Sequence, residues 1–313
     1  MRVVALFSCL LFIVGNAQAY DVDVRDYGAA GDGVTDDTLA FQAALDGRGD
    51  AGGGAVIVPR GKYRIEGTLT IPPSVTLEGT WRAPATVHKY HAETDEPMVE
   101  LDRPGAQVPE LDEFQIGPEL TGSVLFALAG KGEEDGTPFI MLHTNSTLKG
   151  VTIFYPEQTK TNPPIAYPWT VASAGADNCA IIDVLMVNPY QAVDFGNRVA
   201  GRHYIRGLYA QALRRGLYVD RCLDIGRLEN IHFWPFWTAA DEDSPVAEYT
   251  QEHGEAFIFG RSDWQYVSNC FAISYNVGMR FIRSKDEGPY GGGGNYLLTQ
   301  SGADMCNIAV LVE

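Results

Sequence analysis

A short apolar pattern recurs along the second half of this 313-residue chain and restricts the folds open to it. The pattern is apolar-x-x-apolar-x-apolar, and its central residues Leu185, Leu208 and Ile231 follow one another at intervals of 23 residues. Its copies are Leu148/Val151/Ile153, Ile182/Leu185/Val187, Ile205/Leu208/Ala210, Leu228/Ile231/Phe233 and Val267/Cys270/Ala272. A repeat of this length cannot bury its own apolar face, so we expect the copies to stack on one another.

A second pattern, small-apolar-x-apolar, alternates with the first. It occurs as Ala192-Val-Asp-Phe195, Gly216-Leu-Tyr-Val219, Ala256-Phe-Ile-Phe259 and Gly278-Met-Arg-Phe281. Two short strands per repeat, with no helical period between them, predict a β-solenoid in which alternate residues point inward. A β-sandwich or a propeller is the alternative, but the spacing and the blade motifs of those folds are absent.

The segment from Val24 to Tyr63 predicts a strand, a glycine turn, a short helix and a second strand. Thr35 or Asp36 suits the N-cap of this helix, and Gly47 is well placed to end it. The apolar surface of the helix is expected from Leu39, Phe41, Ala43, Ala44 and Leu45.

The run Tyr-Gly-Ala-Ala-Gly-Asp-Gly-Val-Thr-Asp-Asp-Thr, residues 27–38, closely resembles the opening of the rhamnogalacturonase/epimerase-like pectate lyase superfamily. The resemblance extends over residues 24–63 and implies a right-handed parallel β-helix, plugged at one end by a helix. We therefore expect an all-β protein, a single-stranded solenoid with a short N-terminal capping helix. The superfamily includes lyases, hydrolases, epimerase-like proteins and phage tailspikes, so the resemblance specifies the fold more than the reaction.

Residues 1–19 have the pattern of a secretory signal peptide. Arg2 precedes an apolar run from Val3 to Val14, and Ala17-Gln-Ala19 is a small-residue cleavage site. We expect cleavage after Ala19, a β-helix domain over residues 20–313, and a secreted or periplasmic protein. The apolar run is too short for a secure membrane span, so no membrane partner is expected after cleavage.

The formal net charge of −17 argues against nucleic acid as a partner. An acidic polysaccharide would be repelled on average, and would need a local basic groove or bridging Ca²⁺. Much of the acidity lies within residues 88–138, and residues 88–122 are predicted to form an acidic insertion. No cofactor is expected with certainty, and Ca²⁺ enters only if the protein is a lyase.

Four cysteines follow the signal segment, and none has metal-ligand spacing. We expect buried free thiols rather than a disulfide framework at Cys179, Cys222, Cys270 and Cys306.

The second pattern also predicts where chemistry could lie. If its apolar residues point inward, then Asp194, Tyr218, Ile258 and Arg280 point outward on successive rungs. Asp194 and Glu255 would lie two rungs apart, roughly 9–10 Å at about 4.8 Å per rung. That is near the upper end of the roughly 6.5–9.5 Å expected of an inverting glycosidase. One carboxyl group would protonate the leaving oxygen while the other activates water.

In the lyase alternative, Arg215 or Arg280 would remove a proton beside a uronate carboxylate, with Ca²⁺ neutralising that carboxylate. Arginine needs strong local help to act as a base, because its pKa is high. The candidate catalytic residues are Asp194, Glu255, His253, Arg215 and Arg280. Each also has a structural interpretation, as a turn residue or as a surface charge that balances the acidic loops. The Asn-Thr-Asp and Gly-His-Gly segments of the polygalacturonase-like relatives are absent.

Aromatic and basic residues give the candidates for substrate contact. Flat rings with a polar edge suit the faces of sugars, although a solenoid also buries rings in its interior. The predicted substrate-binding residues are Tyr218, Trp234, Trp237, Arg214 and Lys285.

Two functions fit this sequence. The first is an exported enzyme that cleaves a plant or algal polysaccharide, by hydrolysis or by β-elimination. The second is a non-catalytic glycan-binding or tailspike-like β-helix. The last residues, Ile308-Ala-Val-Leu-Val-Glu313, read as a strand still in progress, so we expect further coils beyond them. Substrate, linkage, metal dependence, oligomeric state and the choice among hydrolase, lyase and epimerase stay open at this point.

Overall fold

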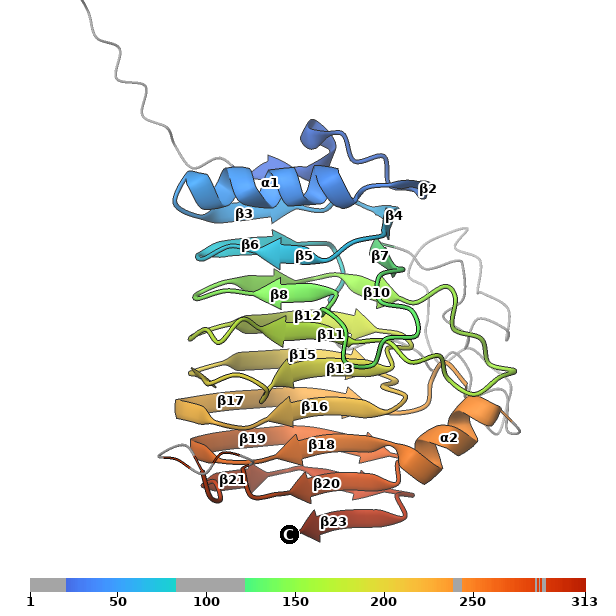
Figure 1. The fold of residues 1–313 in the computed structure, drawn as a ribbon, viewed down its shortest axis with the longest axis vertical. Coiled ribbons are helices and arrows are strands. Elements are labelled where there is room, and N and C mark those ends of the chain that lie inside the picture. Colours follow the sequence, from blue (N-terminus) through green and yellow to red (C-terminus); the bar gives the residue numbers. More distant parts are fainter. Residues whose placement is uncertain (1–20, 83–121, 239–243, 285, 287, 289–290) are drawn as a thin grey trace, which may run out of the picture.

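A computed structural model describes residues 21–82, 122–238, 244–284, 286, 288 and 291–313. They form the predicted right-handed parallel β-helix, with its rungs stacked along the long axis (Figure 1). The predicted signal peptide, residues 88–121 of the predicted insertion, and Lys285 lie outside the described residues.

Two sheets run the length of the stack, and their strands pair in parallel. The eight-stranded sheet contains β5 (Leu69–Ile71), β8 (Ile140–Leu142), β11 (Trp169–Ser173), β13 (Gln191–Phe195), β16 (Arg215–Val219), β18 (Glu255–Phe259), β20 (Val277–Phe281) and β23 (Ile308–Val312). The fifteen-stranded sheet contains β1 (Val22–Asp23), β2 (Asp32–Asp36), β3 (Gly54–Ile57), β4 (Gly61–Ile65), β6 (Val75–Glu78), β7 (Ser123–Ala127), β9 (Thr147–Lys149), β10 (Thr152–Phe154), β12 (Ala180–Met186), β14 (Ala200–Gly201), β15 (Tyr204–Ala210), β17 (Cys222–Phe233), β19 (Ser262–Ile273), β21 (Tyr296–Thr299) and β22 (Gly302–Asp304).

The core between the sheets is built from ladders of like residues. On the eight-stranded sheet Val171, Val193, Leu217, Phe257 and Met279 are in register on successive rungs, and all are buried. Each rung buries its apolar residues against its neighbours, because a single short strand has no core of its own.

One predicted copy of the repeat is shifted by one residue. The residues that pair with Ile205, Leu208 and Ala210 are Ile181, Val184 and Met186, instead of the predicted 182, 185 and 187. In the run from Ala180 to Val187 every residue except Asp183 is apolar, so apolar residues occupy the core positions in either register. Hydrophobicity alone therefore does not fix the register. In the structure, Asp183 in this run adopts a positive φ of 52°.

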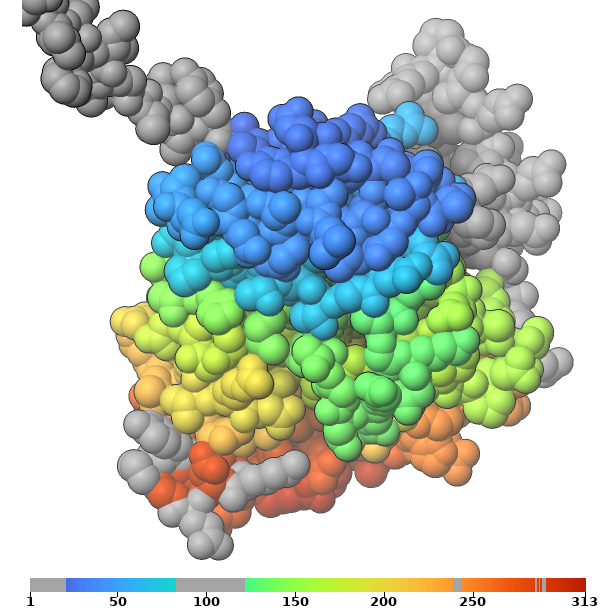
Figure 2. Space-filling model, turned by 45° about the horizontal axis from the view of Figure 1, so that its top comes forward, coloured from blue at the N-terminus to red at the C-terminus, as the bar shows by residue number. Residues whose placement is uncertain are grey.

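The N-terminal end of the stack is covered by α1 (Thr38–Asp50), which follows the short 3-10 helix η1 (Val24–Tyr27) (Figures 1 and 2). The N-cap is Asp37 rather than Thr35 or Asp36, and the helix continues past Gly47 to Asp50. The Asp37 carboxylate accepts hydrogen bonds from the backbone N–H groups of residues 30 and 31, at 2.6 and 3.1 Å, and so ties the glycine turn to the helix.

The buried face of α1 is narrower than predicted. Phe41, Ala44 and Leu45 are buried, whereas Leu39 and Ala43 are exposed. The capping helix therefore covers the first rungs with one short stripe of residues.

A second helix, α2 (Pro245–His253), lies between β17 and β18. Ser244 is its N-cap and Pro245 lies in its first turn, a position that suits the fixed φ of proline. Val246 and Thr250 are buried, and the helix projects from the side of the lower rungs (Figure 1). No helix among the described residues is long and apolar enough to cross a membrane.

The four described cysteines are free thiols. Cys179, Cys222 and Cys270 are buried as predicted, whereas Cys306 is only partly buried. Burial raises the pKa of Cys179 and Cys222 to about 11 and that of Cys270 to about 12, so these thiols stay protonated at neutral pH.

The C-terminal end of the stack has no cap among the described residues. β23 pairs with β20 along one edge only, and Ile308, Val310 and Val312 are 41%, 55% and 74% exposed.

Candidate active site

Two ladders of mostly polar side chains run along the eight-stranded sheet. The predicted ladder is confirmed in register, because Asp194 pairs with Tyr218, Tyr218 with Ile258, and Ile258 with Arg280. A second ladder joins Gln191, Arg215 and Glu255 at the start of the same strands.

A hollow of about 390 Å³ lies over these ladders. It brings together five of the predicted site residues. Its lining residues are Asp135, Trp169, Asn197, Arg214, Arg215, Tyr218, Glu255, Ile258, Arg280 and Ile282. We call this hollow the Glu255 pocket.

One wall of the Glu255 pocket is apolar. Trp169, Tyr218 and Ile258 form a hydrophobic cluster separate from the main core, and Ile282 packs against it. The rings of Trp169 and Tyr218 are stacked, with centroids 6.4 Å apart and planes at 23°. The ring of Tyr218 lies so close to Gly196 that a Cβ there would collide with it. Such a flat wall is suited to the apolar face of a sugar ring.

The tyrosine of this wall is held in place from behind. Tyr218 donates a hydrogen bond to Asp220 Oδ2 at 3.0 Å, and buried Asp220 also accepts one from Ser284 Oγ at 3.0 Å. Burial and the neighbouring charge of Asp220 raise the pKa of Tyr218, so its hydroxyl stays protonated. Tyr218 therefore serves as a positioned ring rather than as a base.

Glu255 lies between two guanidinium groups. Its Oε1 is 2.6 Å from Arg280 Nη1, and its Oε2 is 3.7 Å from Arg214 Nη1. Arg280 also contacts Glu313, at 2.8 Å from Nε. Burial disfavours the charge of Arg280, but these two carboxylates outweigh that effect and raise its pKa. Glu255 is the carboxylate most firmly placed in the pocket.

Arg215 is bound by a different part of the chain. Its Nη1 donates to Gln191 Oε1 at 2.7 Å and to Glu134 Oε1 at 2.9 Å. Glu134 and its neighbour Asp135, which lines the pocket, belong to the loop between β7 and β8.

Asp194 lies on the predicted ladder but does not line the Glu255 pocket. Its Oδ1 accepts hydrogen bonds from the backbone N–H groups of Gly196 and Asn197, each at 2.9 Å. Its Oδ2 accepts one from the Asn197 side chain at 3.0 Å, and it is Asn197 that lines the pocket. Burial raises the pKa of Asp194, and these hydrogen bonds offset only part of that rise. Its catalytic role stays a prediction, while its contacts are those of a turn residue.

The other predicted site residues lie elsewhere. His253 ends α2 with an exposed ring, and only its carbonyl, which accepts a hydrogen bond from Arg214, reaches toward the pocket. Trp234 and Trp237 follow β17 on the fifteen-stranded sheet. Trp237 is buried in the main core, and Trp234 stacks on His232. The structure therefore does not bring either tryptophan to the Glu255 pocket.

Sequence reasoning missed the loop residues Glu134 and Asp135 and the strand residue Gln191. The acidic run from Glu133 to Asp135 lies between Gly132 and Gly136, which is a composition typical of a loop that could cover a sheet face. The contact of Glu134 with Arg215 crosses 81 residues of sequence, and no local pattern predicts a contact of that range.

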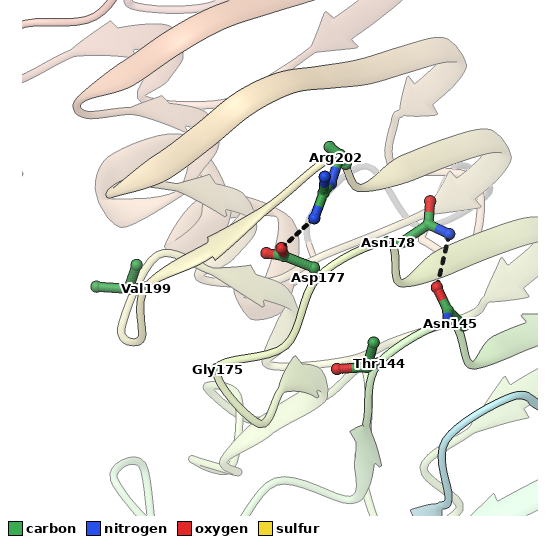
Figure 3. Close-up of a pocket in the computed structure, with 7 residues that line it drawn as sticks. All are labelled: Thr144, Asn145, Gly175, Asp177, Asn178, Val199 and Arg202. Atoms are coloured by element: carbon green, nitrogen blue, oxygen red, sulfur yellow. Dashed lines mark hydrogen bonds and ion pairs between the residues drawn. The ribbon is translucent and has the colours of Figure 1, made fainter.

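A second hollow, of about 810 Å³, lies beside the turns of neighbouring rungs (Figure 3). Asn178 donates to Asn145 Oδ1 at 2.8 Å across it, and Asp177 forms an ion pair with Arg202 (Figure 3). Its other lining residues are Thr144, Gly175 and Val199. It lacks an aromatic wall, so the Glu255 pocket is the better sugar site. Within the described residues no group of three or more His, Cys, Asp or Glu could hold a metal ion.

Comparison with known sequences confirms the predicted resemblance. Residues 22–105 match the family described as rhamnogalacturonase A/epimerase, pectate lyase-like. The mannuronan C5-epimerase AlgE1 of Azotobacter vinelandii is 48% identical over 66 residues, which are 19% of this chain and 5% of that protein. Alginate lyase 7 of the same organism is 55% identical over 47 residues, 15% of this chain and 6% of the lyase. An exopolygalacturonase of Arabidopsis thaliana is 42% identical over 78 residues, 23% of this chain and 17% of that enzyme.

Solved structures share the fold over a larger part of the chain. The N-terminal fragment of bacteriophage phi29 gene product 12 has a TM-score of 0.56 and 14% identity, and the match covers 93% of this chain and 43% of that one. A mutant tailspike of E. coli bacteriophage HK620, solved with a pentasaccharide, has a TM-score of 0.54 and 10% identity, with 90% and 45% covered. This chain thus spans less than half the length of these relatives, and the structural likeness at such identities shows the fold alone.

Proposed function

We propose that this protein is an exported enzyme that binds a polysaccharide in the Glu255 pocket and cleaves it. Residues 22–105 match the rhamnogalacturonase A/epimerase, pectate lyase-like family, and the rest of the described chain continues the same β-helix. The family match and the relatives support action on a carbohydrate. The signal-like residues 1–19 support export to the periplasm or the medium.

One observation carries the proposal. The Glu255 pocket combines a stacked aromatic wall with a carboxylate held between two arginines, on the outer face of a rigid sheet. Apolar rings orient the sugar, and a positioned carboxylate beside it can transfer a proton.

Hydrolysis is the reaction that we favour. Glu255 would take a proton from the attacking water, and a second carboxyl group would give one to the leaving glycosidic oxygen. Asp135 is the second carboxylate on the pocket wall. Asp194 is the alternative acid, because burial raises its pKa, but Asn197 stands between its carboxylate and the pocket. β-Elimination, with an arginine as base, is the second candidate reaction.

The test is an activity screen of the purified protein on neutral and acidic plant and algal polysaccharides. New reducing ends without an unsaturated product indicate hydrolysis, and an unsaturated uronate indicates elimination. Glu255→Gln should lower the turnover by about a hundredfold or more. Glu252→Gln is the matched control, because Glu252 is an exposed carboxylate on α2 outside the pocket. Full activity in Glu255→Gln would contradict the assignment of this residue.

A non-catalytic glycan-binding protein is the alternative function. It is favoured by the two ion pairs that already occupy both oxygens of Glu255. Glycan binding without turnover, unchanged in Asp194→Asn and Glu255→Gln, would support this alternative over the enzyme.

A further inference from the structure

Among the described residues, the carboxylates around the Glu255 pocket outnumber the arginines. Three arginines, Arg214, Arg215 and Arg280, line the pocket together with the carboxylates of Asp135 and Glu255. Two further carboxylates bind these arginines directly, Glu134 on Arg215 and Glu313 on Arg280. Within the described part of the chain, four carboxylates thus face three guanidinium groups, in a protein whose net charge is −17. A binding site for a polyanion would show the opposite excess.

Glu134, whose carboxylate binds Arg215, is itself held by several hydrogen bonds. The backbone carbonyl of Glu134 accepts a hydrogen bond from Gln191 Nε2 at 2.9 Å, and its Oε2 accepts one from the Tyr190 hydroxyl at 3.3 Å. Farther along the loop, the backbone N–H of Gly132 donates to the carbonyl of Ala166 at 2.8 Å. Gln191 therefore holds the loop with its amide N–H and holds Arg215 with its amide oxygen.

The contacts leave part of Arg215 able to bind a ligand. Among the described residues, its hydrogen bonds to Gln191 and Glu134 both use Nη1. Guanidinium carries five N–H donors, so Nη2 and Nε can donate to a sugar. A sugar hydroxyl there adds no charge, whereas a sugar carboxylate would lie close to the carboxylate of Glu134 and be repelled.

On these grounds, and resting on the proposed function, we infer that the Glu255 pocket takes an uncharged sugar and that Glu134 is a specificity-determining residue that excludes uronates. The epimerase and alginate lyase relatives do not argue against this, because residues 22–82, the described part of the matching family segment, contain no lining residue of the pocket. The inference also selects the reaction. Elimination needs a proton made acidic by a neighbouring carboxylate, which a neutral sugar lacks. Hydrolysis needs only water, whose oxygen bonds to the anomeric carbon as the glycosidic C–O bond breaks and a proton passes to the leaving oxygen.

The experiment compares the affinities of wild type and Glu134→Gln for two sets of oligosaccharides by calorimetry. One set is neutral, from galactan, xylan and glucan, and the other is acidic, from polygalacturonate and alginate. Wild type should bind a member of the neutral set more tightly than any acidic one. Glu134→Gln should raise the affinity for the acidic set relative to the neutral set by about tenfold. Glu133→Gln, the same charge change on the adjacent exposed residue, should leave the ratio unchanged.

Arg215→Gln combined with Glu134→Gln is the second variant, and it should abolish the gain, because the gain depends on the freed guanidinium. Thermal melting of each variant shows that it is folded. Tighter binding of acidic than of neutral sugars by wild type, or an unchanged ratio in Glu134→Gln, would overturn the inference and leave the proposed function standing. Absence of binding to either set in every folded protein would overturn both.

Discussion

Asp194 and Glu255 project from the same sheet, two rungs apart, yet their carboxylates have different partners. Glu255 contacts charged side chains in the pocket, whereas Asp194 contacts the backbone of the turn that follows its own strand. At the scale of the residue, the strand register decides on which face of the sheet a side chain lies. The groups next to it, such as the turn after Asp194, decide which partners its carboxylate binds.

Asp194→Asn tests the structural role of this carboxylate. An amide cannot accept all three hydrogen bonds, so we expect the free energy of unfolding to fall by about 1–3 kcal/mol. Urea denaturation measures the change, with the exposed Asp135→Asn as the control. A variant as stable as wild type but without turnover would instead establish Asp194 as a catalytic residue.

His203 should make the stability of the protein depend on pH. Burial lowers its pKa from 6.5 to about 4, so the folded protein keeps this ring neutral where the unfolded chain binds a proton. The free energy of unfolding should therefore fall as the pH drops through this interval, by about 2 kcal/mol between about pH 7 and about pH 5. Urea denaturation at several pH values checks this. His203→Gln should flatten the slope, whereas the exposed His253→Gln should not; an equal slope in all three proteins would show that other groups are responsible.

At the scale of the element, the rungs depend on small residues where two backbones approach closely. A Cβ on Gly216 in β16 would collide with the carbonyl of Ala256 in the next rung and with the ring of Phe233. Gly216→Ala should therefore force adjacent rungs apart and lower the free energy of unfolding by about 1–3 kcal/mol. Gly293→Ala is the control, because a Cβ there meets no atom within 4 Å. Equal unfolding midpoints for the two variants would contradict the close packing of these rungs.

The sequence predicts the strands better than it predicts their details. The small-apolar-x-apolar pattern identified the ladder from Asp194 to Arg280, because inward-facing apolar residues alternate with outward-facing ones along each strand. The first pattern failed at residues 181–187, where nearly every position is apolar. Neither pattern identified α2, whose cap and proline lie in an acidic stretch. The pocket was only half predictable, since Glu134 and Asp135 reach it from a loop far away in the sequence.

At the scale of the whole molecule, the two ends of the stack differ. α1 covers the first rung, whereas β23 presents an edge that no other described strand pairs with, and several exposed apolar residues. Such an edge pairs readily with another chain. We expect the polypeptide of residues 20–313 to self-associate with rising concentration, as measured by sedimentation velocity. Replacing Val310 and Val312 by lysine should suppress this association, and Val34→Lys, a change at an exposed residue far from β23, should not. Association that persists in the β23 variant would place the contact elsewhere.

The loop between β7 and β8 is held by contacts different from those that hold the strands beneath it. The strands that form the floor of the Glu255 pocket are fixed by backbone pairing repeated over many rungs. Glu134 and Asp135 instead belong to one loop, which a few side-chain contacts hold in place. Mutation or exchange of this one loop should therefore change which sugars the pocket binds while the β-helix still folds. Proteins with this β-helix can thus evolve a new substrate range through a few substitutions in one peripheral loop.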